Sequence, residues 1–261
     1  MMKRREFLKT TAATSALATL GGASLSVSAH SGTNETQDVA CCDRTHATVQ
    51  DAMKAPAETI AYVPAIYAGT GIQKPDYLAT IDVDPKSADY GKVISRLEMP
   101  NVGDELHHFG WNACSSCHGK EGAGRRFIVL PGIASGRIHI VDTEDPRQPK
   151  LHKVIEPEVV KAKTGLSAPH TVHCLADGTV LISMLGDSNG DAPGGFMMMD
   201  SEFNILGRWE KDSTGMNFNY DYWYQPRHNV MLSSEGGAPN TVSQAFKLAD
   251  VKAGKYGRHL H

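Results

Sequence analysis

The sequence predicts an all-β protein built as an incomplete β-propeller. An apolar strand that closes on aspartate recurs three times, and the closing residues Asp82, Asp142 and Asp200 lie 60 and 58 residues apart. A fixed period of this kind, with about four strands in each repeat, is typical of propeller blades. The 25 glycines and 13 prolines supply many turns, and no long helical period interrupts the pattern.

The chain begins with an expected export signal. Lys3-Arg4-Arg5-Glu6-Phe7-Leu8-Lys9 fits the twin-arginine consensus, and Val27-Ser28-Ala29 offers small residues for cleavage. The apolar stretch between them is too short and too mild to span a bilayer. The alternative is a basic start to a first helix. We expect a twin-arginine signal at residues 1–29, an amino-terminal arm at 30–55, a partial propeller at 56–261, and a periplasmic location.

Each repeat consists of an apolar strand, a polar loop and a second strand. The predicted pairs are 76–82 with 92–97, 136–142 with 151–155, and 194–200 with 205–209. A sandwich of hairpins is the alternative, which the regular spacing disfavours. Three repeats predict about three to four blades, whereas a closed propeller has about four to eight. We therefore expect an incomplete ring, and a second chain is one source of the missing blades.

Composition limits the partners. The formal net charge is -3, and no basic run follows the first few residues. Nucleic acid would need a basic face, so we expect no nucleic-acid partner, and we expect no membrane span.

Histidines mark the predicted inner strands of successive blades. His107 and His108 precede one such strand, His170 and His173 fall at the next, and His228 is less well aligned. The first two pairs are 63 to 65 residues apart, close to the repeat length, so blade symmetry would bring them together near the propeller axis. Neutral imidazole binds copper, zinc, iron and nickel alike. Each histidine alone could equally be a polar channel or turn residue, but we hypothesise one shared metal site.

Cys114-Ser115-Ser116-Cys117-His118 has the spacing of a c-type haem attachment motif. The motif lies between predicted strands rather than in a small helical domain, which disfavours haem. A disulfide or a thiol–metal pair is the favoured interpretation, because two sulfurs at this spacing can meet each other or one ion. Cys174 is expected in a separate strand.

Several segments from about residue 50 onward resemble the selenium-binding protein/methanethiol oxidase family, in its amino-terminal half only. They are residues 77–87, 104–112, 114–117, 149–157 and 222–231. Two family cysteines, one of them linked with selenium, align with Gly91 and Ala65, so selenium binding is doubtful here.

The resemblance implies a seven-bladed propeller in full-length members, and a copper-dependent oxidation of methanethiol by oxygen and water to formaldehyde, hydrogen sulfide and hydrogen peroxide. Asp104 or Glu105 would take protons or orient an imidazole. The alternative is that both are ordinary loop residues exposed to solvent. A non-catalytic selenium- or metal-binding propeller and a c-type haem protein remain the rival functions.

Overall fold

A computed structural model describes residues 45–120, 124–225 and 228–261. The chain divides into two units, residues 1–38 and 39–261, and all described residues belong to the second. The expected signal and most of the expected arm therefore lie outside the described residues.

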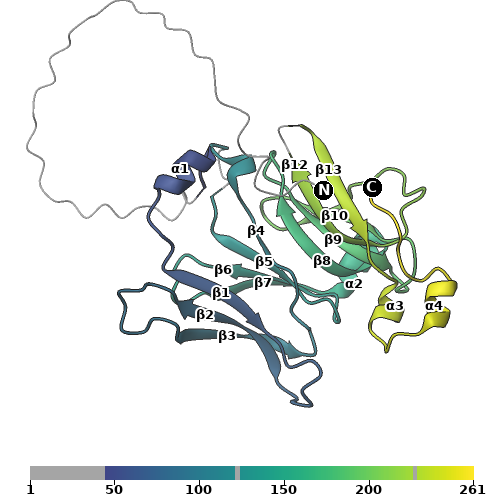
Figure 1. Cartoon of the computed structure of the whole chain (residues 1–261), viewed down its shortest axis with the longest axis horizontal. Coiled ribbons are helices and arrows are strands. Elements are labelled where there is room, and N and C mark those ends of the chain that lie inside the picture. Colours follow the sequence, from purple (N-terminus) through teal and green to yellow (C-terminus); the bar gives the residue numbers. More distant parts are fainter. Residues whose placement is uncertain (1–44, 121–123, 226–227) are drawn as a thin grey trace, which may run out of the picture. The chain divides into compact units, whose positions relative to one another are not determined.

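Four antiparallel sheets follow one another along the chain (Figure 1). In each sheet, strands that are consecutive in sequence are hydrogen-bonded neighbours, which is the up-and-down order of a propeller blade. The sheets consist of β1 (Ile60–Ala65), β2 (Pro75–Asp82) and β3 (Val93–Val102); β4 (Gly110–Trp111), β5 (Phe127–Pro131), β6 (Ile138–Asp142) and β7 (Lys150–Ile155); β8 (Leu166–Cys174), β9 (Val180–Asp187), β10 (Gly195–Met199) and β11 (Ile205–Arg208); and β12 (Asn219–Gln225) with β13 (Val230–Glu235). The predicted all-β fold class is confirmed.

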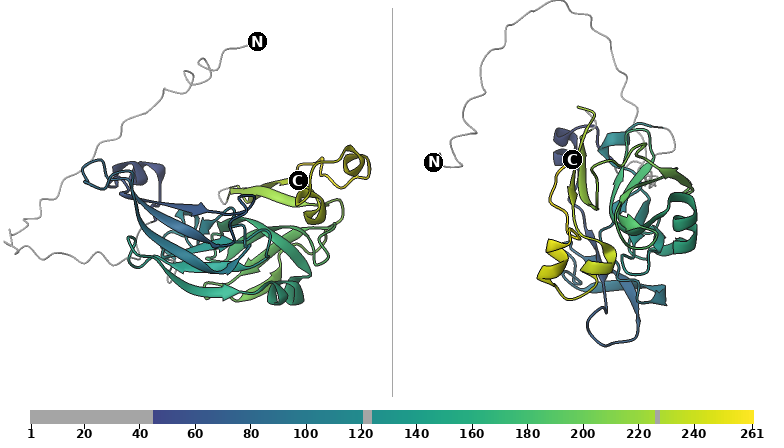
Figure 2. Two further views of the ribbon diagram at one scale, coloured as in Figure 1. Left: turned by 90° about the horizontal axis from the view of Figure 1, so that it is seen from below. Right: turned by 90° about the vertical axis from the view of Figure 1, so that its right-hand side faces the viewer.

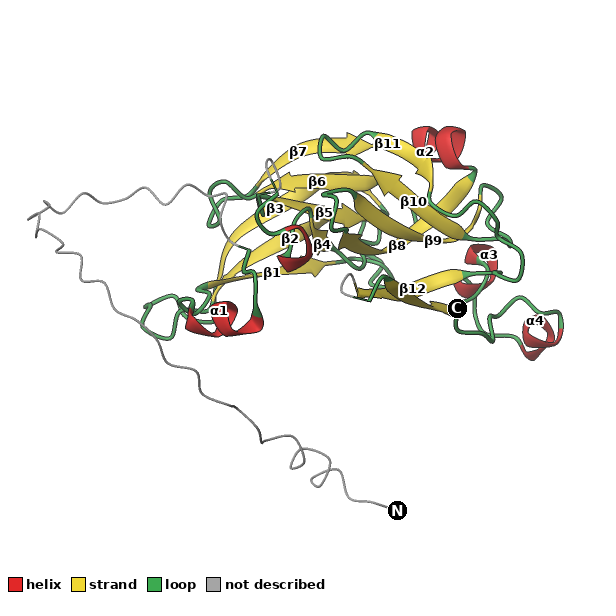
Figure 3. Cartoon of the chain, turned by 90° about the horizontal axis from the view of Figure 1, so that it is seen from above, coloured by secondary structure: helices red, strands yellow, loops and turns green. Residues whose placement is uncertain are grey.

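Helices are short and lie before the first strand, between strands or after the last sheet (Figure 3). Both views in Figure 2 show α3 and α4, drawn in yellow, beside the β12–β13 pair. The helical elements are α1 (Val49–Lys54), the 3-10 turn η1 (Ser115–Cys117), α2 (Pro157–Thr164), α3 (Pro239–Val242) and α4 (Leu248–Lys252). Among the described residues, no helix is both long and apolar enough to cross a membrane.

The first and last sheets depart from the expected four strands, with three and two strands respectively. The last sheet is extended by chain-terminal residues. The Ser233 N–H donates to the His261 carbonyl, the His261 N–H donates back to Ser233, both at 2.9 Å, and Leu260 bridges Ser234. Residues 259–261 therefore pair with β13 through backbone hydrogen bonds.

The repeated aspartates have a common structural task. Asp82, Asp142 and Asp200 each stand where a strand ends, and each Oδ1 accepts the backbone N–H two residues later, at 3.0, 2.9 and 2.9 Å. Such a turn lets a short side chain satisfy the backbone as the chain reverses toward the next strand. The period in the sequence is thus a period of turns between the last two strands of three sheets.

Successive sheets pack face to face. Side chains alternate between the two faces of a strand. In β5, Ile128 and Leu130 contribute to a core shared with the first sheet, whereas Val129 faces the third sheet. In β9, Ile182 joins the core against the second sheet, and Leu181 packs toward Tyr222 of the fourth. This stacking brings the first strands of neighbouring sheets together.

Candidate metal centre

Three imidazoles converge where the second, third and fourth sheets meet. One nitrogen from each of His107, His108 and His170 can be chosen so that all lie within 4.8 Å of one another. The ring centroids of His108 and His170 are 4.2 Å apart, those of His107 and His170 are 4.8 Å apart, and those of His107 and His108 are 5.0 Å apart. His170 is fully buried, whereas His108 reaches solvent. The cluster therefore has a closed side and an open side.

Irregular strand pairing positions these side chains. The loop before β4 is fixed by the His107 N–H, which donates to the Pro131 carbonyl at 2.9 Å. The β8–β9 register shifts between Pro169 and Val172, exactly where His170 lies, so the strand carries a bulge there. Bulges re-aim side chains and are common beside functional sites. An alternating strand pattern read from the sequence does not foresee this re-aiming.

A hydrogen-bond chain orients His170. Its Nδ1 lies 2.9 Å from the Thr171 hydroxyl, and that hydroxyl donates to Asp221 Oδ1 at 2.8 Å. Because the carboxylate only accepts, the hydroxyl proton goes to Asp221 and the hydroxyl oxygen accepts the Nδ1 proton. Nε2 of His170 then carries a lone pair, and it is buried without a hydrogen-bond partner among the described residues.

The electrostatics keep His170 neutral. Burial, followed by the neighbouring imidazoles of His108 and His107, lowers the pKa of His170 to about 3, although Asp221 opposes the shift. Burial and then His108 also lower the pKa of His107. Only a neutral imidazole offers a lone pair to a metal ion.

These residues fit a metal ion such as copper. Metal-bound histidine usually donates its other ring N–H to a carboxylate, a backbone carbonyl or a water, which fixes the tautomer. The Thr171–Asp221 chain does this for His170, and the partnerless buried Nε2 lacks the contact that a metal would supply. Imidazole suits copper, zinc, iron or nickel, so the residue type does not select among them.

Two other histidines singled out in the sequence lie outside this cluster. The His173 ring packs edge-on against Tyr222 and Trp223, at centroid distances of 5.1 and 5.2 Å. Chiefly burial lowers its pKa. His228 occupies the exposed turn after β12, at the opposite end of that strand from Tyr220, whose ring is 4.1 Å from His170. The structure therefore brings together three of the five expected ligands.

The two acidic residues beside the histidine pair have different environments. Asp104 is fully buried, with Oδ1 3.1 Å from Arg137 Nη1 and Oδ2 3.3 Å from His139 Nε2. Burial alone would raise the pKa of Asp104, but hydrogen bonds from His139, Ser135 and Arg137 outweigh it and the pKa is lowered. Asp104 is thus committed to a structural ion pair. Glu105 instead lines the cavity that His107 lines.

Sequence reasoning missed Thr171, Tyr220 and Asp221. Asp221 follows His170 by 51 residues and stands near the start of the next sheet's first strand, β12. This interval is shorter than the repeat of about sixty residues, so the sequence period could not have found it. The Thr171 hydroxyl bridge joins β8 to β12, and the pairing of each of these strands with its own neighbour is irregular at that point.

The C-x-x-C-H motif forms η1 and the residues around it. Cys114 and Cys117 are free thiols, and the Cys114 N–H lies 3.4 Å from Cys117 Sγ. Cys117 is 2% exposed, which leaves no surface for a thioether bond to a porphyrin. His118 Nδ1 is 2.9 Å from the Thr45 hydroxyl. This arrangement does not suit covalent haem attachment.

Two cavities flank the histidines. Glu105 and His107 line one of about 500 Å³, whose walls include Ile133, Leu185 and Val242. His108 lines another of about 440 Å³, together with Thr171, His173 and Asp221. One of the two loop histidines therefore lines each cavity, whereas the buried His170 lines neither.

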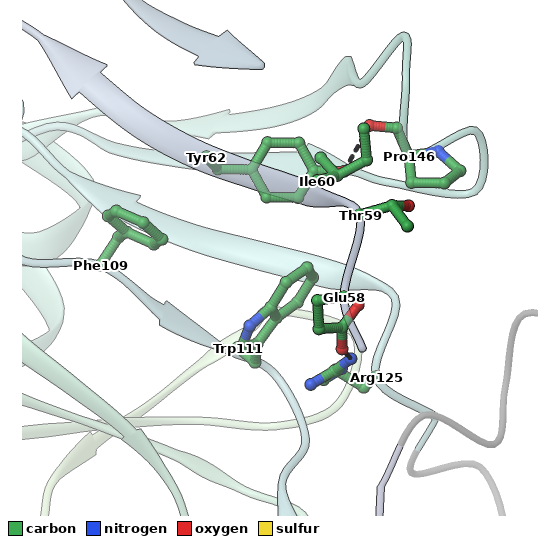
Figure 4. A pocket seen from close by; sticks show the side chains of 8 residues that line it. All are labelled: Glu58, Thr59, Ile60, Tyr62, Phe109, Trp111, Arg125 and Pro146. Atoms are coloured by element: carbon green, nitrogen blue, oxygen red, sulfur yellow. Dashed lines mark hydrogen bonds and ion pairs between the residues drawn. The ribbon is translucent and has the colours of Figure 1, made fainter. Parts of the chain in front are cut away.

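A further cavity of about 380 Å³ contains none of the cluster histidines (Figure 4). Its aromatic wall includes Trp111, over which the Arg125 guanidinium lies at 5.1 Å while it pairs with Glu58 at 2.9 Å. The Tyr62 hydroxyl donates to the Pro146 carbonyl at 2.7 Å. These contacts join β1 to the second sheet, so we assign this cavity no chemistry.

Residues 40–261 match the protein family described as 56kDa selenium binding protein. The chain belongs to this family. Residues 1–21 match the signal sequence of the twin-arginine translocation pathway, which supports export. The resemblance inferred from the sequence motifs is thereby confirmed.

Relatives of the selenium-binding family carry two names. Selenium-binding protein 1 of Arabidopsis thaliana is 56% identical over 83% of this chain and 44% of its own length. Methanethiol oxidase of Homo sapiens is 54% identical over 84% of this chain and 47% of its own length. The chain thus spans about half the length of these curated relatives.

A solved structure shares the fold. The hypothetical selenium-binding protein of Sulfolobus tokodaii superposes with a TM-score of 0.75 at 44% identity, over 81% of this chain and 50% of that one. The match supports the blade-like arrangement of the four sheets.

Proposed function

We propose that this chain carries part of a methanethiol oxidase, in which His107, His108 and His170 hold a copper ion. The reaction would convert methanethiol, oxygen and water into formaldehyde, hydrogen sulfide and hydrogen peroxide, with all atoms balanced. Relatives named methanethiol oxidase, at about 54% identity, support the activity. The observation that carries the site is the buried, partnerless Nε2 of His170 beside two further imidazoles.

Bound copper would supply Lewis acidity and one-electron transfer, so that the thiol loses its proton more readily and oxygen can be reduced. The chain's own residues prepare that site. Thr171 and Asp221 hold the Nδ1 proton of His170 and leave Nε2 free. Glu105, beside His107 on the wall of the 500 Å³ cavity, is placed to accept the proton of an entering thiol.

The proposal also covers where the protein acts and what completes its site. The export signal suits a periplasmic enzyme with a folded, metal-loaded site. Because the chain spans about half of its relatives, we propose that a second chain or further blades complete the site, so this chain alone should bind copper weakly and turn over slowly.

The test compares the chain with its His170→Ala variant. We expect the affinity for copper(II), measured by equilibrium titration, and methanethiol-dependent peroxide to fall together in His170→Ala, while His152→Ala, an exposed histidine on β7, retains both. An unchanged copper(II) affinity in His170→Ala would place the site elsewhere. Copper bound without any peroxide above the metal-free level would support the non-catalytic metal-binding alternative instead.

A further inference from the structure

A second group of metal-binding side chains lies on the last sheet and shares no residue with the first histidine cluster. One ligand atom from each of Glu235, His259 and His261 can be chosen so that all three lie within 4.8 Å of one another. Glu235 ends β13, and the two histidines follow it by 24 and 26 residues. Among the described residues, only this group and the first cluster bring three such atoms so close together.

Backbone pairing aligns the two histidines. Ser233 and His261 exchange two N–H···O bonds at 2.9 Å, and the Glu235 N–H donates to the His259 carbonyl at 3.2 Å. Residues two apart on an extended segment share a face, so both imidazoles lie on the side of the pair where Glu235 stands opposite His259. Gly257 permits the close approach of the two segments, since a Cβ there would collide with Glu235.

The Glu235 carboxylate is buried and charged, with a side chain that is 1% exposed. Its Oε1 accepts the Asn217 N–H at 2.9 Å, and its Oε2 accepts the N–H groups of Arg258 and His259 at 2.8 and 3.1 Å. Burial alone would raise the pKa of Glu235, but the backbone donors of Arg258 and Asn217 and the two imidazoles lower it to about 2. Backbone N–H groups thus hold a negative charge beside both imidazoles.

The spacing of the donor atoms suits one shared ion. His259 Nδ1 lies 3.1 Å from Oε2 of Glu235, and His261 Nε2 lies 3.2 Å from Oε1. Zinc binds nitrogen and carboxylate oxygen at about 2.0–2.2 Å with tetrahedral angles, which separates neighbouring ligand atoms by about 3.3–3.5 Å. A neutral imidazole can carry its proton on either ring nitrogen. With the proton on the far nitrogen, the nitrogen that faces Glu235 has a lone pair for the ion.

The ligand types indicate which ion fits. Two imidazoles with one carboxylate are a known ligand set of zinc, which then keeps a fourth position for water, and of iron(II). Magnesium and calcium prefer oxygen ligands and are disfavoured. The nearest cationic side chain, Arg258, is engaged elsewhere, because its guanidinium donates to the Val251 carbonyl of α4 at 3.1 Å. The rings of His259 and His261 are 61% and 26% exposed, so an ion can enter from solvent.

We infer that Glu235, His259 and His261 form a second metal site, which binds one zinc ion. The twin-arginine signal supports export to a compartment more oxidising than the cytoplasm, where zinc is favoured over iron(II) because it has no redox chemistry. The ion would tie the segment that carries both histidines to the end of β13. This inference does not depend on the oxidase proposal, since it uses none of the three histidines of the first cluster.

The test titrates zinc into the full chain, free of any histidine tag, in which His170→Ala disables the first cluster. A coloured zinc indicator competes for the ion, and X-ray absorption identifies the neighbours of the bound zinc. We expect one zinc per chain, with nitrogen and oxygen neighbours only. A further His261→Ala should weaken the affinity more than about tenfold, because loss of an outer partner alone costs that much. His152→Ala, at an exposed histidine on β7, should leave it unchanged.

Two more variants separate metal binding from folding. His259→Ala removes the most exposed ligand, and Glu235→Gln keeps an oxygen acceptor for the backbone donors but removes the charge. Both should also weaken zinc binding more than about tenfold while circular dichroism stays unchanged. Equal zinc affinity in the His261→Ala and His152→Ala chains, or sulfur among the neighbours of the bound zinc, would overturn the site.

Discussion

At the scale of single residues, one hydroxyl determines how His170 presents its ring. The Thr171 hydroxyl stands between His170 Nδ1 and the Asp221 carboxylate, and no other described side chain is hydrogen-bonded to that nitrogen. Thr171→Val keeps the shape of the side chain and removes the link. We expect the copper affinity of the chain to fall by about 10- to 100-fold, because partners of metal ligands usually contribute that much.

Competition with a copper chelator measures this loss. Thr179→Val, which removes a hydroxyl from the exposed turn between β8 and β9, is the matched control and should leave the affinity unchanged. Equal copper affinity in both variants would show that the hydroxyl does not orient the ligand.

The sequence predicted the histidine cluster only in outline. The 63-residue interval pointed to His107 with His170, and the structure brings these two together. It could not tell that His173 turns toward Tyr222, because the bulge at His170 changes which residues share a face. Nor could spacing reveal that Cys174 joins Cys114 and Cys117, since that contact forms between distant segments.

At the scale of elements, the strand pairs were predictable because their turns repeat. The expected strand 136–142 is observed as β6 (Ile138–Asp142), and 151–155 as β7 (Lys150–Ile155). The turn that joins them is held by a local hydrogen bond, which the Glu144 N–H donates to Asp142 Oδ1. The strand counts of the outer sheets were not predictable, because a strand forms only where a neighbour pairs with it.

The Asp142 turn also carries an ion pair whose effect should depend on pH. Arg126 donates to both carboxylate oxygens of Asp142, at 2.8 and 2.6 Å, and these hydrogen bonds lower the pKa of Asp142. Asp142→Asn preserves the turn acceptor and removes the charge. We expect a loss of about 1 kcal/mol in the free energy of unfolding at pH 7, since the pair is partly exposed.

The sign of the pH dependence follows from the lowered pKa. The native carboxyl keeps its charge at a lower pH than the unfolded one, so its contribution is present above the ordinary aspartate pKa of about 3.9 and disappears as pH falls through the lower native value. Urea unfolding at pH 7 and pH 3 should therefore show a difference between wild type and Asp142→Asn that shrinks at pH 3. A difference that grows in acid would contradict the assignment.

At the scale of the whole described unit, stability should depend on the cores between sheets more than on any single sheet. The largest cluster joins β5, β6 and β7 to β8, β9 and β10, and it includes Ile140, Met197 and Phe203. The hairpins themselves are local, but the cores join residues that are distant in sequence. The period of the sequence predicts the sheets, whereas the match between their faces depends on side-chain volumes that pack only once the sheets stack.

Ile140→Ala tests whether the stacked sheets unfold as one unit. Ile140 is fully buried in the shared core, so its truncation should leave a cavity between two sheets and cost about 2–5 kcal/mol. Leu206→Ala on β11 is the control, because that side chain is 55% exposed and should cost no more than about 0.5 kcal/mol. Urea unfolding followed by tryptophan fluorescence should show one transition that shifts to lower urea in Ile140→Ala, because both sheets lose the same packing. If the variant instead shows two separate transitions, or shifts no more than Leu206→Ala, the sheets are stable independently and the shared core does not couple them.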